Sequence, residues 1–472
     1  MSTFFIVDFS SNAVMFPKAK CVCVEIYKKY DVLSIHFCTD VGYYDVEVNF
    51  MNKKVRIGIV GFGEFSLSHI EIFMAHPDVE EVVGAEINPE RRKFVEDKYG
   101  IKMYASYDEM LEKAVGINSV GIFSQRHQHG PMIIQALKSG KNVFSAVPMG
   151  CTEDEVLEVV RLVEKTRLTY AMGETCYYFP CAVWARKQRE SGKFGDVVYG
   201  EAQYYHDVTE MFGSFQSLGA SFKRVAGIPP MFYGTHSAAM LLSSMGSRPV
   251  EVSCFGYEDK IGDGVYGKGM NDWDNPFSNE TAIVRLENGA LGRMNEFRRI
   301  GTVKPSSYIT GIYGTKGAYE YSGNQHLFST GGVFGQEPDS EDVSEAINTF
   351  TFNEEKETAA KKEGRLEYRY HTGFSPVHNT KRLPKNLVEM AETARKNNDL
   401  SIIGHNGSHF FCIDDFVKAV CEDKIPPINA WNSAIYTLTG IVAHESAMQN
   451  GRTLKIPYVG NPPEGKEVMN FD

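Results

Sequence analysis

Hydrophobic and polar residues alternate in a regular pattern between residues 55 and 168. Short apolar runs such as VRIGIVG (55–61) and NVFSAV (142–147) are separated by longer segments in which apolar residues recur every three or four positions. Such short runs are typical of buried strands, and the longer period is typical of amphipathic helices. The alternation predicts right-handed βαβ units that build a parallel sheet.

The pattern differs on both sides of this region. Residues 1–50 contain three strand-like runs, CVCVEIY, VLSIHF and YYDVEVNF, which we expect to form a small antiparallel meander. After about residue 175, long segments such as ETAIVRLENGALGRMNEF predict a mostly antiparallel sheet. Residues 336–366 are polar and charged, and we expect an exposed loop there. Two helical segments, HFFCIDDFVKAVCED and NAWNSAIYTLTGIVAHESAMQNG, and a short strand, TLKIP, close the chain.

These elements predict the α/β class: a Rossmann dinucleotide-binding domain followed by an α+β domain with a large, mostly antiparallel open sheet. We expect a β-rich extension at 1–52, the Rossmann domain at 53–175, and a domain for substrate binding and oligomerisation at 176–472. Met51 resembles an ordinary start for the domain behind it, so the role of the extension stays open.

Composition narrows the choice of partners. The 472 residues carry a formal charge of -11, which argues against binding to nucleic acid or anionic membranes. No apolar stretch reaches the roughly 18 residues of a membrane span, and the first residues lack the basic region of a signal peptide. The nine cysteines show no C-x-x-C or zinc spacing. We therefore expect reduced thiols, a cytoplasmic protein and no metal.

A glycine-rich turn follows the first predicted strand of the Rossmann domain. In Gly61-Phe62-Gly63-Glu64-Phe65-Ser66, the first glycine permits a tight turn and the second lets the backbone approach a pyrophosphate. Glu86 lies 25 positions after Gly61, where an acid accepts hydrogen bonds from ribose hydroxyls and repels a 2′-phosphate. NAD is the predicted cofactor, and Arg91 and Arg92 leave NADP open. The expected cofactor-binding residues are Gly61, Phe62, Gly63, Glu64, Phe65, Glu86, Arg91, Ser124, His127, His129, Ala146, Val147 and Pro148.

The segment ALKSGKNVF (136–144) and the residues after it resemble the Gfo/Idh/MocA (glucose–fructose oxidoreductase / inositol dehydrogenase) family over roughly residues 53 to 458. Dehydrogenases of that family continue into Glu-Lys-Pro, so their lysine, which hydrogen-bonds the reacting hydroxyl, maps onto Val147. Their second signature, an Asp four residues before a His, maps onto Phe232 and His236. Two groups of the usual polyol dehydrogenases are therefore absent.

The chain is more similar to a branch of NAD-dependent glycoside hydrolases, first recognised as α-N-acetylgalactosaminidases. That branch also has Val-Pro at the triplet, a Tyr-x-His-Asp strand end and a Tyr-x-Thr-His motif, as this chain has at 204–207 and 233–236. Departures are Ala146 before Val-Pro, Gly234 in the second motif, and no arginine directly after His-Asp. The resemblance implies the catalytic residues His236, Tyr178, His206 and His405, with Asp207 and Tyr233 as substrate contacts. Trp273, in a loop, is a further candidate to stack on a sugar.

The predicted reaction begins with hydride transfer from the sugar C3 to NAD⁺. The resulting ketone acidifies the C2 hydrogen, a base removes it, the C1 substituent leaves, water adds, and the ketone is reduced again. This route tolerates an uncharged Ala-Val-Pro edge where histidines and tyrosines replace the lysine. An NAD-dependent sugar, glycoside or cyclitol dehydrogenase that releases NADH, and a non-catalytic sugar- or nucleotide-binding regulator, are the alternatives. We expect a small carbohydrate as the partner and a homodimer or homotetramer.

Overall fold

The computed structural model of the chain describes most of its residues. The described residues are 19–27, 32–39, 42–49, 54–212, 222–301, 306–323, 325–332, 337–348, 358, 362–364, 373–397 and 399–470. Near the N-terminus, the strands β1 (Ala19–Tyr27), β2 (Val32–Thr39) and β3 (Gly42–Asn49) pair antiparallel in that order. The three predicted strands of the meander are therefore confirmed.

A six-stranded, fully parallel sheet follows, in the order β6-β5-β4-β7-β8-β9. Its strands are β4 (Val55–Val60), β5 (Val79–Ala85), β6 (Lys102–Tyr104), β7 (Ser119–Ile122), β8 (Asn142–Ser145) and β9 (Tyr170–Met172). The helices between them are α1 (Glu64–Ala75), α2 (Pro89–Tyr99), α3 (Tyr107–Lys113), α4 (Arg126–Lys138) and α5 (Glu153–Thr166). The strand order reverses between β4 and β7, and ligands of open α/β sheets bind at such a switch point.

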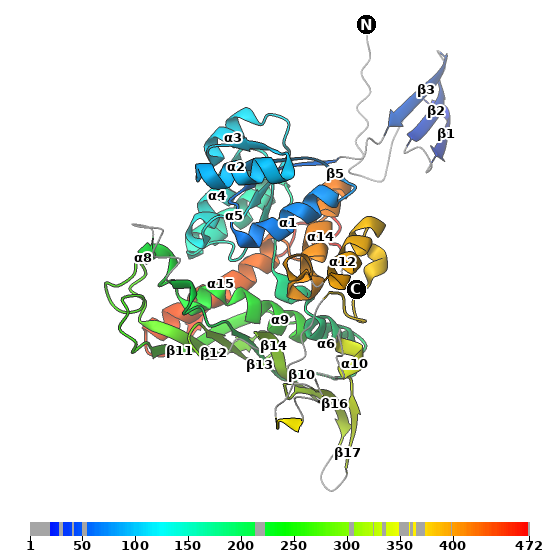
Figure 1. The fold of residues 1–472 in the computed structure, drawn as a ribbon. Coiled ribbons are helices and arrows are strands. Elements are labelled where there is room, and N and C mark those ends of the chain that lie inside the picture. Colours follow the sequence, from blue (N-terminus) through cyan, green and yellow to red (C-terminus); the bar gives the residue numbers. More distant parts are fainter. Residues whose placement is uncertain are drawn as a thin grey trace.

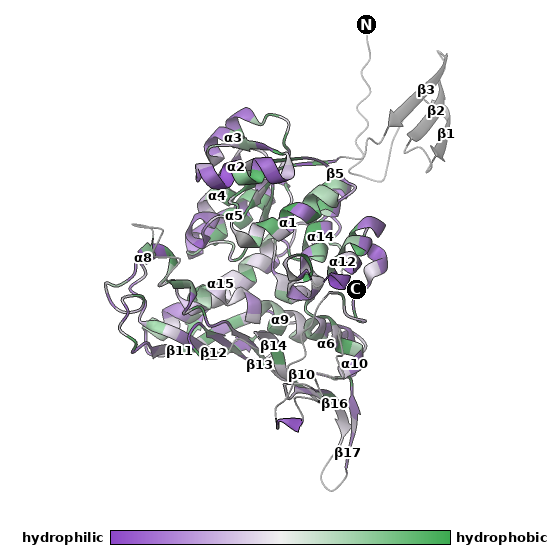
Figure 2. Ribbon diagram, in the orientation of Figure 1, coloured by the Kyte–Doolittle hydropathy of each residue, from purple (hydrophilic) through white to green (hydrophobic). Residues whose placement is uncertain are grey.

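Hydropathy explains this layering. In Figure 2, α2 and α3 are largely hydrophilic, and the parallel strands beside them are hydrophobic. Every residue of β7 and β8 is buried, as expected for strands covered by helices on both faces. Helix α5 begins with the capping box of Thr152 and Glu155, which satisfies backbone N–H groups at the helix start.

The second sheet has nine strands in the order β17-β16-β15-β14-β10-β13-β12-β11-β18, and only β10 and β13 pair in parallel. Its strands are β10 (Val197–Tyr205), β11 (Pro249–Glu258), β12 (Phe277–Leu286), β13 (Leu291–Phe297), β14 (Ser307–Gly314), β15 (Gly317–Tyr321), β16 (His326–Gly331), β17 (Pro338–Asp342) and β18 (Leu454–Lys455). The predicted mostly antiparallel sheet is confirmed, and with it the α/β class.

Helices join the two sheets (Figure 1). These are α6 (Pro180–Glu190), α9 (Thr235–Met245), α12 (Lys385–Lys396), α14 (Ser408–Glu422) and α15 (Ala430–Met448). Helix α9 packs on β10, α15 contacts both β11 and α5, and α14 lies beside α1. One hydrophobic core therefore runs from Ile57 in the parallel sheet to Met294 in the second sheet.

Shorter elements complete the fold. They are η1 (Thr175–Tyr178), α8 (Phe222–Val225), η3 (Pro230–Tyr233), α10 (Ser344–Ile347), η4 (Thr380–Arg382), α13 (Leu400–Ile403) and η5 (His405–Gly407). No helix among the described residues is long and apolar enough to cross a membrane.

The expectation of a loop over 336–366 was wrong in its first part. Residues 338–342 form β17, which pairs with β16 at the edge of the second sheet. Backbone hydrogen bonds build this strand, and all five of its side chains are exposed, so its acidic sequence gives no hydrophobic signal. Charged side chains are common on edge strands because they discourage pairing with other chains. Most of 349–366 lies outside the described residues.

Candidate active site

The glycine-rich turn between β4 and α1 has the geometry of a dinucleotide-binding loop. Gly61 has a φ of 85°, and a Cβ there would lie 2.8 Å from the backbone of Phe123, so only glycine suits this position. A Cβ on Gly63 would meet no atom within 4 Å, which leaves open space at the start of α1. The N-terminal N–H groups of a helix next to open space suit a pyrophosphate. Glu64 begins α1, and its side chain lies outside the described part of the structure.

Glu86 follows β5 directly and holds this turn in place. Its carboxylate accepts hydrogen bonds from the backbone N–H of Phe62 at 3.0 Å and of Asn88 at 2.9 Å. A carboxylate offers about four lone-pair positions, so two remain for ribose hydroxyls. Arg92 donates to the Glu86 carbonyl at 2.7 Å, and the Arg91 side chain is exposed. The residues around the turn therefore fit NAD.

The loops after β7 and β8 are tied together by His129. Its Nδ1 lies 2.8 Å from the Pro148 carbonyl oxygen and its Nε2 lies 3.0 Å from that of Ser124. Burial lowers the pKa of His129 to about 4, so the ring is neutral and donates to one carbonyl at a time. Burial lowers the pKa of His127, and the charge of Arg224 in α8 lowers it further. Of the two histidines, His129 is thus the one that shapes the edge formed by residues 146–148.

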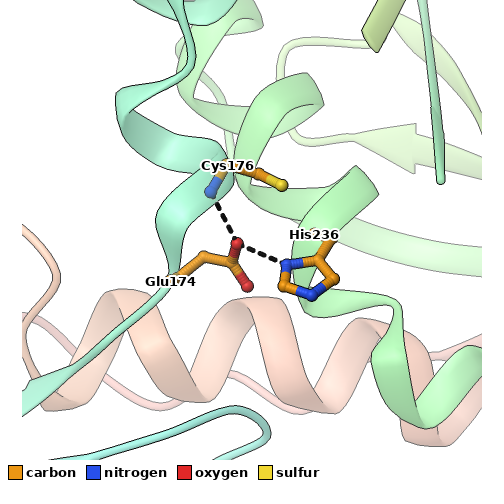
Figure 3. Close-up of side chains that lie close together, drawn as sticks. All are labelled: Glu174, Cys176 and His236. Atoms are coloured by element: carbon orange, nitrogen blue, oxygen red, sulfur yellow. Dashed lines mark hydrogen bonds and ion pairs between the residues drawn. The ribbon is translucent and has the colours of Figure 1, made fainter. Parts of the chain in front are cut away.

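A buried hydrogen-bonded pair lies where η1 meets α9. Glu174 Oε1 accepts from His236 Nδ1 at 2.7 Å and from the Cys176 backbone N–H at 2.9 Å (Figure 3). Glu174 is fully buried and His236 is 7% exposed. The carboxylate fixes the proton of His236 on Nδ1 and leaves Nε2 as the atom that can take a proton.

Among the residues that the structure describes, one group of side chains is close enough to hold a metal ion. Its members are Glu174, Cys176 and His236, whose potential ligand atoms lie within 4.8 Å of one another. However, the hydrogen bond between His236 and Glu174 already joins two of the three. Burial also raises the pKa of the Cys176 thiol well above its usual value, which opposes the thiolate that a metal requires. The arrangement therefore favours an oriented histidine over a metal centre.

Tyr204 and His206, at the end of β10, lie beside this pair. The Tyr204 ring centroid is 4.5 Å from that of His236, and its hydroxyl is 2.8 Å from His206 Nδ1. Burial raises the pKa of Tyr204 well above its usual value, so the hydroxyl stays protonated and can donate to His206. Burial, followed by the charges of Arg298 and His236, lowers the pKa of His206 to about 3. His206 is thus a neutral ring whose Nε2–H can donate.

His405, in η5, lies within electrostatic range of His236 and His206. Its side chain is accessible to solvent, yet the protein atoms around it, followed by the charge of His236, lower its pKa to about 4. Its φ is 52°, and those of Asn406 and Gly407 are 57° and 72°, so three consecutive residues are left-handed. Non-glycine residues in this conformation cost roughly 1–3 kcal/mol each and are frequent at active sites. The exposed ring of Phe65 lies 5.8 Å from His405, which connects the glycine-rich turn to the histidines.

Tyr233 lies in the same group, between two arginines that the motifs did not indicate. Its ring is 5.5 Å from that of His236. The Arg126 guanidinium carbon lies 4.1 Å from the Tyr233 ring centroid, and that of Arg298 lies 4.4 Å from it. Arg126 begins helix α4 of the Rossmann domain, whereas Arg298 follows strand β13 of the second sheet, so the two arginines come from different parts of the fold.

Three predicted site residues are not part of this group. The buried Tyr178 donates to Asp415 at 2.6 Å and stacks on Phe411, inside the core. Asp207 accepts from three backbone N–H groups, at Thr209, Ile300 and Gly301; although burial opposes it, these bonds lower its pKa to about 2. Trp273 donates to the Arg224 carbonyl and packs edge-on against Phe232. Each of the three therefore has a structural partner.

Comparison with known proteins agrees with this geometry. Residues 55–174 match the sequence profile of the oxidoreductase family with an NAD-binding Rossmann fold, Gfo/Idh/MocA. Over these residues the chain is similar to that family and shares its NAD-binding domain. The match confirms the predicted family and its NAD-binding domain.

Curated relatives of the chain include proteins named as glycosidases. A glycosyl hydrolase family 109 protein of Saccharopolyspora erythraea is 26% identical over 290 residues, 57% of this chain and 63% of the relative. The α-N-acetylgalactosaminidase of Shewanella oneidensis is 28% identical over 168 residues, 33% of this chain and 36% of the relative. The chain thus matches less than two thirds of the length of these relatives.

Solved structures of two dehydrogenases share the fold of most of the chain. Levoglucosan dehydrogenase in complex with NADH has a TM-score of 0.61 at 17% identity, covering 86% of this chain and all of that one. The scyllo-inositol dehydrogenase of Lactobacillus casei, with bound NAD(H) and scyllo-inositol, has a TM-score of 0.58 at 16% identity and covers 86% and 99%. At this identity the likeness establishes the fold.

The sequence analysis assigned no role to several residues of this site. Glu174 is one of them, because its pairing with His236 joins positions 62 residues apart. Arg126 and Arg298 lay outside every motif. For Arg298 one sequence signal existed. The relatives have an arginine after His-Asp that is missing here, and an arginine on a neighbouring strand could take its place.

Proposed function

We propose that the chain is an NAD-dependent enzyme that hydrolyses a glycoside by transient oxidation at C3. Residues 53–175 would be the cofactor domain and residues 176–472 the substrate domain. The observation that carries the proposal is the buried pair of Glu174 and His236, which presents a histidine nitrogen beside neutral His206 and His405. The family 109 glycosidases among the relatives support the choice of a glycoside.

When bound, NAD⁺ would accept a hydride from the sugar C3 and return it at the end of the cycle. The chain's own groups would then handle protons. His236 Nε2 removes a proton from the substrate, and a well-placed base of this kind accelerates a reaction by about 10²–10⁴-fold. His206 donates its Nε2–H to the developing oxygen anion next to it. Loss of the C1 substituent and addition of water at C1 complete a net hydrolysis.

The absence of the family lysine is compatible with this role. Val147 stands at that position, so residues 146–148 after β8 carry no ionisable side chain, and the histidines are the groups to which we assign proton transfer. The site offers no pair of carboxylates at its surface: Glu174 is fully buried on His236, and burial raises the pKa of Glu296 to about 8. Ordinary acid-base glycoside hydrolysis uses two such carboxylates.

The test is a screen of 4-nitrophenyl α- and β-glycosides with and without added NAD⁺, reading nitrophenol and NADH separately. Nitrophenol release without NADH accumulation is expected, and in D₂O the released sugar should carry deuterium at C2. NADH accumulation would indicate the dehydrogenase. Binding of sugar and NAD⁺ without any turnover would indicate a regulator.

A matched pair of variants isolates His236. Like His236, His444 is 7% exposed and bonds to a buried glutamate through Nδ1, here to Glu280 at 2.8 Å. His236→Asn should lower kcat by about 10²–10⁴-fold. His444→Asn should lower the melting temperature about as much as His236→Asn does, but should cause little loss of kcat. Equal kcat values in the two variants would contradict the role of His236.

The remaining proposals concern the state of the protein. We propose a homodimer or homotetramer in the cytoplasm. The side of the second sheet that faces away from α9 and α15 carries Phe255, Tyr257, Ile283 and Leu291 as exposed side chains. The cysteines at 151, 176, 181, 254, 412 and 421 are free thiols, as a reducing compartment would keep them. A monomeric mass in solution would exclude the oligomer.

A further inference from the structure

Two guanidinium groups converge on Tyr233, one from the start of helix α4 and one from the end of strand β13. Arg126 and Arg298 both lie within 4.4 Å of the Tyr233 ring centroid. Arg298 is also 5.0 Å from the ring of Tyr204, which lies nearly parallel to that of Tyr233 at 6.2 Å. Both positive charges depress the pKa of His206, after the larger effect of burial. The two arginines thus act on the place where the substrate's reacting groups would lie.

The charge of these arginines is only weakly neutralised. Within the described ranges Arg126 forms no ion pair, and the single carboxylate partner of Arg298 is Glu296 at 3.2 Å. Burial raises the pKa of Glu296 to about 8, so at neutral pH this carboxyl is largely uncharged. Arg298 is 4% exposed, and its Nη1 is buried without a hydrogen-bond partner. An unpaired buried donor is costly, and a ligand acceptor would satisfy it.

The other carboxylates around the site are already engaged. Glu174 accepts from His236, and Asp207 accepts from backbone N–H groups. Asp272 pairs with Arg224, and Asp259 and Asp263 pair with Arg299. Among the described residues none of these carboxylates pairs with Arg126 or Arg298, so the two guanidinium groups keep N–H donors that a ligand could use.

We propose that Arg126 and Arg298 form an anion-binding subsite beside the histidines, and that the glycoside substrate carries a carboxylate, sulfate ester or phosphate ester. This inference rests on the proposed function for the glycoside and adds the charge of its substituent. Arginine suits the role because its planar fork binds such oxyanions through two parallel hydrogen bonds. The flanking tyrosine rings hold both guanidinium groups by cation–π contact, so little side-chain freedom is lost on binding.

Matched substrates test the subsite directly. The 4-nitrophenyl glucuronides and galacturonides are compared with the glucosides and galactosides of the same anomer, and the 6-sulfates and 6-phosphates form two further arms. We expect kcat/KM to be about 10- to 100-fold higher for at least one charged member than for its neutral partner, the range of one charge-assisted hydrogen bond. The preferred arm identifies the anionic group. Arg126→Gln should reduce that preference by a similar factor, while Arg161→Gln, on the surface of α5, should keep it.

The outcomes separate this inference from the proposed function. Turnover that favours neutral glycosides would overturn the subsite and leave the glycosidase standing. Without turnover of any glycoside, glucuronate, galacturonate or hexose 6-phosphate should still raise the melting temperature with NAD⁺ present, less so in Arg126→Gln; this would support the subsite alone. A higher KM for NAD⁺ in Arg126→Gln, equal for all substrates, would assign the arginine to the cofactor and refute the subsite. Arg298→Lys, checked by its melting curve, should weaken the same preference.

Discussion

Replacing Glu174 by glutamine should separate catalysis from stability. The side chain is fully buried, and its Oε1 accepts from His236 Nδ1 at 2.7 Å. Glutamine keeps the volume but removes the charge, which weakens a charge-assisted hydrogen bond that contributes about 1.5–3 kcal/mol. If this energy acts fully in the transition state, kcat falls about 10- to 150-fold. Loss of control over the His236 tautomer would enlarge the effect.

The assay is steady-state kinetics on the best glycoside of the screen, with a melting curve for each variant. KM should change little, because Glu174 is covered by protein and does not reach the substrate. Glu280→Gln is the control, since Glu280 is equally buried and accepts from His444 Nδ1 and the Met231 backbone N–H, both at 2.8 Å. The reasoning is refuted if Glu174→Gln retains full kcat, or if both variants lose kcat equally.

Three further predictions concern stability and cofactor binding. Because burial raises the pKa of Glu296 to about 8, the native state holds its proton more tightly than the unfolded chain does. The stability that the protonated carboxyl contributes is therefore lost as pH rises from about 4.5 to 8. Denaturant titrations over this pH range should show that Glu296→Gln gains stability relative to the wild type, by up to a few kcal/mol. Gly61→Ala should lower both the melting temperature and the affinity for NAD. Gly63→Ala should weaken NAD binding in calorimetry but leave the melting temperature unchanged, because its Cβ meets only open space. Equal melting temperatures for the two variants would contradict this. Tyr178→Phe should reduce the free energy of unfolding by about 1.5–3 kcal/mol, because the hydrogen bond to Asp415 is lost, and should leave kcat within a few-fold of the wild type. A loss of kcat with an unchanged melting curve would instead favour a catalytic Tyr178.

Hydrophobic periodicity determined the first sheet because each of its elements is encoded locally. A buried parallel strand needs a continuous apolar run, and the helix that follows needs an apolar stripe, so both are visible within a few residues. The turn at Gly61 was equally legible, since its φ of 85° demands glycine. Strand β17 was missed for the converse reason: an edge strand with five exposed side chains is held by backbone hydrogen bonds that leave no trace in side-chain hydrophobicity.

The sequence by itself determined the Rossmann domain, its affinity for NAD and the candidate histidines 206, 236 and 405, because glycine geometry and motif spacing are properties of short segments. The tertiary structure alone decided how those histidines are used. Glu174 reaches His236 across 62 positions, and Arg126 meets Arg298 across 172 positions and from another sheet. Hydrogen bonds, burial and electrostatic coupling depend on distances in space. The packing of α9 against β10, η1 and α15 sets these distances, and no local sequence pattern encodes them.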